Sequence, residues 1–155
     1  MSDHDIQMTV NGRKFARRVP ARRTLLDFLR MDLGFTGTHT GCEHGVCGAC
    51  TILVDGIAQR ACLTLAVQMD GHEVTTVEGV ASSDGVFNTV QKALHENHAL
   101  QCGFCTPGIV MTLTSMHQAG ASAQDMKAAM SGHICRCTGY QGLLRAIDHI
   151  AGGQP

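Results

Sequence analysis

The sequence is poor in aromatic residues and in charge. It has no Trp, one Tyr and three Pro among 155 residues, and 16% of it is charged. Its 12 Lys and Arg nearly balance 13 Asp and Glu, giving a formal net charge of −1. No basic stripe and no acidic tail stand out, so neither nucleic acid nor an anionic membrane is expected as a partner.

Targeting and membrane-spanning segments are also missing. Residues 1–10 have neither the basic and apolar regions of a secretory signal nor a twin-Arg pair. No stretch approaches the roughly 18 apolar residues of a transmembrane helix. We therefore expect a cytoplasmic protein with reduced thiols, in which clustered Cys usually serve metal or redox chemistry.

What is abundant is glycine, at 18 residues, and cysteine, at 8. This cysteine content is below the roughly 8–10% typical of short disulfide scaffolds. With 44% hydrophobic residues the chain can bury a core, and its length suits one domain or two small ones.

Alternating apolar residues and turn dipeptides predict β hairpins in the first half. We expect strands over residues 6–10, 14–19, 51–54, 57–61 and 73–77. Asn11-Gly12 and Asp55-Gly56 suit the positive φ angles of type I′ turns. A short helix should begin after an N-cap at Thr24 and end at Gly34. Together these elements predict an α+β domain over residues 1–78.

Beyond it, helical periodicity replaces the strands. Residues 78–85 are polar and small, and predict a linker. Four helices are expected, over residues 86–95, 107–117, 122–130 and 140–150, with Val86 and Phe87 on the apolar face of the first. Residues 79–155 should therefore form an all-α four-helix bundle.

The first four cysteines have the spacing of a metal cluster. Cys42, Cys47, Cys50 and Cys62 form C-x4-C-x2-C with a fourth Cys eleven residues later, which is the plant-type spacing for a 2Fe-2S cluster. Glycines between them leave room for backbone N–H groups near sulfur. A structural zinc site or buried structural thiols are the alternatives. A Rieske centre is excluded, because no His follows another Cys at the required spacing.

The second set pairs Cys102-x2-Cys105 with Cys135-x-Cys137, each pair just ahead of a predicted helix. Helix N-termini favour thiolate over thiol, so four cysteines there could make one anionic site. This spacing belongs to no common zinc finger, and a second cluster is favoured over a thiol pair used for disulfide exchange.

Three runs together resemble a known family. They are CEHGVCGAC at 42–50, QCGFCTPG at 101–108 and CRCTGY at 135–140. In this order they resemble the small iron-sulfur subunit of molybdenum hydroxylases of the xanthine oxidase family. The resemblance implies a ferredoxin-like (β-grasp) N-terminal domain and a helical C-terminal domain, each with one 2Fe-2S cluster.

The resemblance also implies roles and partners. The cluster of Cys42, Cys47, Cys50 and Cys62 would lie nearer FAD in a medium subunit. That of Cys102, Cys105, Cys135 and Cys137 would lie nearer a molybdenum pterin cofactor in a large subunit, with Gln101 and Cys137 beside the pterin. The chain would relay electrons between them within a dimer of heterotrimers, without a catalytic residue of its own. A free two-cluster ferredoxin and a zinc-stabilised interaction module are the alternatives.

Other chemically suggestive residues have simpler explanations. His95, His98 and His133 are expected to be exposed to solvent, because no second ligand accompanies them at zinc spacing. Met111 and Met126 fall in predicted helices and should fill the core.

Overall fold

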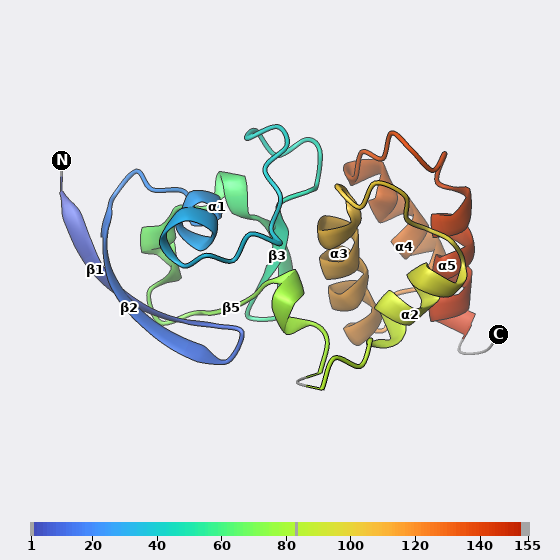
Figure 1. Ribbon diagram of the computed structural model, residues 1–155, viewed down its shortest axis with the longest axis horizontal. Coiled ribbons are helices and arrows are strands. Elements are labelled where there is room, and N and C mark those ends of the chain that lie inside the picture. Colours follow the sequence, from blue (N-terminus) through green and yellow to red (C-terminus); the bar gives the residue numbers. More distant parts are fainter. Residues whose placement is uncertain (1, 83, 153–155) are drawn as a thin grey trace.

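A computed structural model describes residues 2–82 and 84–152, in two parts that lie side by side (Figure 1). A five-stranded sheet has the order β2-β1-β5-β3-β4. Its strands are β1 (Asp3–Val10), β2 (Arg13–Pro20), β3 (Thr51–Val54), β4 (Ile57–Arg60) and β5 (Glu73–Thr75). β1 and β5 run parallel, and the other paired strands run antiparallel. None of the described helices is long and apolar enough to cross a membrane.

Four helices follow the sheet. They are α2 (Thr89–Glu96), α3 (Thr106–Gln118), α4 (Ala123–Ala129) and α5 (Gln141–Gly152). The predicted α+β class, with strands first and a helical part after them, is confirmed.

Both hairpin turns have the geometry that their dipeptides predict. Asn11 and Gly12 have φ angles of 50° and 74°, and Asp55 and Gly56 have 49° and 82°. Two successive positive φ angles are the mark of a type I′ turn, whose twist matches that of the flanking strands.

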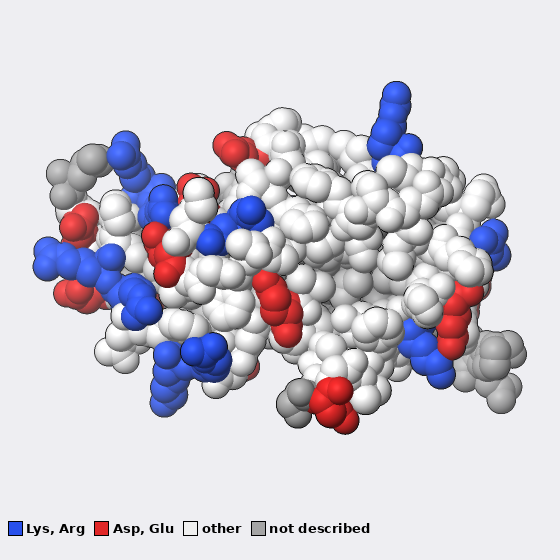
Figure 2. Space-filling model, in the orientation of Figure 1, with Lys and Arg blue, Asp and Glu red and all other residues white. Residues whose placement is uncertain are grey.

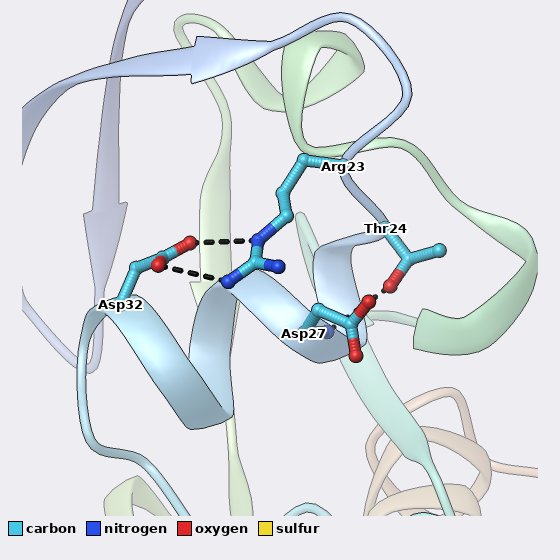
Figure 3. A network of polar contacts seen from close by, with 4 residues as sticks. All are labelled: Arg23, Thr24, Asp27 and Asp32. Atoms are coloured by element: carbon cyan, nitrogen blue, oxygen red, sulfur yellow. Dashed lines mark hydrogen bonds and ion pairs between the residues drawn. The ribbon is translucent and has the colours of Figure 1, made fainter.

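The helix after Thr24 begins as predicted but changes its winding. The Thr24 hydroxyl accepts a hydrogen bond from Asp27 N–H at 3.1 Å and so caps α1 (Leu25–Asp27). Residues 28–32 then continue as a π-helical turn. The guanidinium of Arg23 spans this segment with two bonds of 2.9 Å to the carboxylate of Asp32 (Figure 3). Apolar spacing predicted the helix but not its wider turn.

The start of α2 corrects the prediction for that helix. Asn88 caps it, because its side chain accepts from Gln91 N–H at 2.8 Å while the Gln91 side chain accepts from Asn88 N–H at 3.0 Å. Val86 and Phe87 therefore lie outside the helix and are 61% and 56% exposed. A capping box defines a helix start more strongly than an apolar pair.

Buried apolar side chains form two clusters. The first draws its residues from the sequence between Ile6 and Val74, and the second from that between Val90 and Ile150. The second includes Met126, as expected of a core methionine, and Met111 is buried as well. α3 lies against β3 where the two parts meet (Figure 1). The boundary after residue 78 remains a prediction, and position 83 of the linker lies outside the described residues.

Charge is less evenly spread than expected. Six of the 12 Lys and Arg residues lie between Arg13 and Arg23, on β2 and just after it. Figure 2 shows basic side chains gathered at that end of the molecule. Acidic side chains lie among them, as in the ion pairs Arg18–Asp3 and Arg23–Asp32, so this end is mixed in charge.

Candidate metal centres

The loop around Cys42 is shaped to hold an anionic sulfur. Cys47 N–H donates to Cys42 Sγ at 3.4 Å. Backbone N–H groups of Cys47, His44 and Val46 lower the pKa of the free Cys42 thiol to about 6. Glu43 has a φ angle of 59°, which helps the chain curl around the sulfur. The loop thus favours a thiolate before any metal binds.

Cys50 and Cys62 form the other side of this site. Cys50 precedes β3, and Cys62 lies in the helical turn after β4, so the β3–β4 hairpin carries both. They are 2% and 9% exposed. Burial, together with the neighbouring thiols of Cys62 and Cys47, raises the pKa of the Cys50 thiol to about 11. With the contact between Cys47 and Cys42, these interactions link all four cysteines of the set.

Two positions of this loop require glycine for steric reasons. A Cβ on Gly41 would lie 2.9 Å from Cys47 Sγ. Gly48 has a φ angle of 78°, and a Cβ there would lie 2.5 Å from the carbonyl oxygen of Gly132 and overlap His133. At both positions the absence of a Cβ therefore allows a close contact that a larger residue would prevent.

The second four cysteines also lie together. Cys105 is the N-cap residue of α3, and Cys135 and Cys137 precede α5. Burial and the adjacent Cys135 thiol raise the pKa of Cys105 to about 12. The N–H of Phe104 and the Cys137 thiol lower the pKa of Cys102. The C-x2-C and C-x-C pairs therefore face each other, thiol to thiol.

Tyr140, the only tyrosine, holds this second set in place and was not predicted to do so. Its hydroxyl accepts from Cys135 N–H at 2.9 Å and donates to His133 O at 2.8 Å. Its φ angle of 63° is unusual for an L residue and turns the chain between Cys137 and α5. The only sign of this role in the sequence is that the single Tyr follows the predicted ligand Cys137 by three residues.

The prediction that His133 is exposed to solvent is wrong. His133 is 1% exposed, whereas His95 and His98 are exposed as expected. Its Nε2 is 2.8 Å from Thr112 Oγ1, and its Nδ1 is buried without a hydrogen-bond partner. Burial lowers the pKa of His133 to about 4, so the ring is a neutral packing group between the two parts.

One short contact connects the two cysteine sets. Ile134 N–H donates to Cys47 O at 3.0 Å, and Ile134 is the residue before Cys135. The Arg60 guanidinium stabilises the same junction, because it donates hydrogen bonds to Gly132 O at 2.8 Å and to the Thr51 hydroxyl. The backbone of the Cys47 loop is thus hydrogen-bonded directly to the segment that carries Cys135.

The donor set fits two 2Fe-2S clusters. All eight cysteines are free thiols. Within the described ranges, no group of three or more His, Cys, Asp or Glu is arranged to hold a metal ion. A 2Fe-2S cluster takes two cysteines on each of two irons, so its four sulfurs need not converge on one point. The assignment of the ligands remains a prediction.

The residues predicted to lie beside the pterin are open to a partner. Gln101, Cys102 and Cys137 are all exposed. Arg136, between two predicted ligands, is exposed as well. The second set therefore reaches the surface, whereas Cys50 and Cys62 do not.

Two family models match the chain. The model described as "2Fe-2S iron-sulfur cluster binding domain" matches residues 8–79, and that described as "[2Fe-2S] binding domain" matches residues 76–148. Caffeine dehydrogenase subunit gamma of Pseudomonas sp. (strain CBB1) is 51% identical, over 97% of this chain and 93% of its own. Nicotine 6-hydroxylase small subunit of Paenarthrobacter nicotinovorans is also 51% identical, over 92% and 87%. The crystal structure of quinoline 2-oxidoreductase from Pseudomonas putida 86 superposes with a TM-score of 0.87 at 41% identity, over all of both chains.

Proposed function

The chain belongs to the small iron-sulfur subunits of xanthine oxidase family molybdenum hydroxylases, and on that premise we propose that it relays electrons from a molybdenum subunit to a flavin subunit. The observation that carries the proposal is the pairing of two four-cysteine sets through one backbone hydrogen bond, from Ile134 N–H to Cys47 O. Each set would hold one 2Fe-2S cluster.

The molybdenum pterin, when bound in the partner subunit, would supply the two-electron oxidation of a substrate, and the two sets of four cysteines would hold clusters that serve as one-electron carriers. Cys102, Cys105, Cys135 and Cys137 would hold the entry cluster, because Cys102 and Cys137 are exposed whereas no cysteine of the other set is. Gln101, exposed beside Cys102, would give the pterin a hydrogen-bond partner. The N–H groups around Cys42 stabilise negative charge on sulfur and would help set the potential of the N-terminal cluster.

Apolar side chains around the cysteines support permanent docking over a shuttle role. Six of the ten exposed large apolar residues in the described ranges lie within three positions of a predicted ligand. They are Val46, Leu63, Leu65, Leu100, Phe104 and Ile134. Lys, Arg, Asp and Glu are sparse over the middle of the molecule in Figure 2. Exposed apolar surface of this kind marks a protein–protein contact, and its position at both cysteine sets supports the docking of a partner at each.

We propose large and medium subunits as partners, in a dimer of heterotrimers in the cytoplasm. The names of the relatives, "subunit gamma" and "small subunit" among them, support a multisubunit complex. The boundary after residue 78 is proposed to separate the flavin-facing part from the molybdenum-facing part.

The substrate of the partner is proposed to be an N-heterocyclic compound. Caffeine, nicotine and quinoline, in the names of three relatives at 51%, 51% and 41% identity, all contain such a ring. Copurification of the partners with the tagged chain, followed by assay with quinoline and with benzaldehyde, would test this. Oxidation of benzaldehyde alone would overturn it.

Metal and sulfide analysis tests the relay itself. We expect four irons and four acid-labile sulfides per chain, because eight cysteines fill two sites of four. Reduction should give two distinguishable paramagnetic signals, one for each environment. Stoichiometric zinc without sulfide would favour the interaction module. A stable loaded monomer that never copurifies with larger chains would favour the free ferredoxin.

A further inference from the structure

The two cysteine loops meet through a pair of stacked rings. His39 and Phe104 have ring centroids 5.0 Å apart and planes 25° apart. His39 Nδ1–H also donates to the backbone oxygen of Phe104 at 2.8 Å. His39 lies three residues before Cys42, and Phe104 lies between Cys102 and Cys105. Each ring therefore belongs to the loop of a different cysteine set.

The edge of Phe104 and the sulfur of Cys47 both lie close to the Cα of Gly41, on the side where a side chain would project. A Cβ on Gly41 would lie 3.4 Å from Phe104 Cε1 and 2.9 Å from Cys47 Sγ. Ring and sulfur thus crowd the same side of Gly41, which leaves no room for a larger residue there. Phe104 is 49% exposed, so its remaining surface faces outward.

We propose that His39 and Phe104 are positioning residues that let the helical part set the environment of the N-terminal cluster. The stack holds the Cys102–Cys105 loop against Gly41, and the ring keeps water from Cys47. The proposal rests on the assignment of both cysteine sets to 2Fe-2S clusters.

Excluding water should change the reduction potential of the cluster in one direction. Reduction adds one negative charge to a cluster that is already anionic, and water stabilises the more highly charged state. An apolar cover around a metal site therefore lowers the reduction potential. Removing the cover should raise the midpoint potential of the N-terminal cluster, although Phe104 belongs to the other loop.

A second His–Phe pair provides the control. Phe87 and His95 have ring centroids 6.3 Å apart at 64°, with Phe87 56% exposed. Neither residue is next to a predicted ligand. Phe87→Ala removes an exposed phenyl ring from the helical part; Phe87 lines a pocket with Gln101 and Gly103, so the control applies to the N-terminal cluster.

The test is a redox titration of both clusters, followed by electron paramagnetic resonance, in the purified complex. The N-terminal signal is assigned beforehand with Cys50→Ser. Phe104→Ala and His39→Ala should each shift its midpoint potential upward, with unchanged iron content, and His39→Phe should restore most of the wild-type value by keeping the stack. Phe87→Ala should leave the N-terminal potential unchanged.

A second readout does not depend on turnover. Loss of the N-terminal cluster to an added iron chelator should be about two- to tenfold faster in His39→Ala, the range expected when one aromatic pair is lost. Wild-type potential and chelation rate in fully loaded His39→Ala and Phe104→Ala proteins would overturn the proposal. If Phe104→Ala fails to assemble, His39→Ala decides alone, because it leaves residues 101–108 intact. Absence of iron from the wild-type protein would instead overturn the proposed function.

Discussion

Replacing Tyr140 by Phe removes one oxygen atom that holds together the second cysteine set. The hydroxyl accepts from Cys135 N–H at 2.9 Å and donates to His133 O at 2.8 Å. Each hydrogen bond contributes about 0.5–1.5 kcal/mol, so their joint loss should cost about 1–3 kcal/mol of unfolding free energy. The phenyl ring, which packs against the helical core, is retained.

The assay is thermal unfolding of the wild-type and Tyr140→Phe proteins at equal iron content. For a chain of this length, about 1 kcal/mol corresponds to about 2–4 °C in the unfolding midpoint. We also expect the signal of the C-terminal cluster to broaden, because the N–H that precedes the Cys135 sulfur is no longer fixed. The N-terminal signal should not change.

Ser131→Ala is the matched control. Its hydroxyl donates to Ala128 O at 2.8 Å at an exposed position, so its loss should stay within about 0.5 kcal/mol. If Tyr140→Phe melts at the wild-type temperature with an unaltered C-terminal signal, the hydroxyl does not hold the Cys135 turn, and the reasoning from those two bonds is refuted.

Four further substitutions test the junction and the relay. Gly108→Ala should cost at least about 1–3 kcal/mol in chemical denaturation, because its Cβ would lie 2.9 Å from the carbonyl carbon of Gly48 and closer still to the oxygen. Cys50→Ser should block electron transfer to flavin in stopped-flow spectra while substrate still reduces the molybdenum, whereas Cys105→Ser should trap electrons at the molybdenum; a stall at the same centre in both would contradict the order of clusters. Gln101→Ala should slow cluster reduction by substrate without changing iron content, and a wild-type rate would remove Gln101 from the path.

Local chemistry explains which predictions hold. The Asn11-Gly12 and Asp55-Gly56 turns form as expected, because their positive φ angles are a property of the dipeptides themselves. Thr24 caps its helix for a similar reason, since the donor is only three residues away. Where a prediction depended on apolar periodicity, as at Val86 and Phe87, a local cap overrode it.

The spacing of the cysteines identified both sets, because a cluster requires several thiolates at suitable intervals. It did not reveal what surrounds them. The second set depends on Tyr140, whose hydroxyl reaches back to His133 across seven residues. No spacing rule predicts this contact, which requires the left-handed conformation of Tyr140.

The junction between the two parts could not be predicted, because its contacts join residues far apart in the chain. Gly48 reads as one more glycine of a cluster loop, yet its missing Cβ makes room for His133, 85 positions later. His133 reads as a surface histidine, yet it is buried because that space exists. Each residue explains the other only after folding. The same holds for Cys47 O and Ile134 N–H, so the contacts between the two cysteine sets are the feature least accessible from sequence.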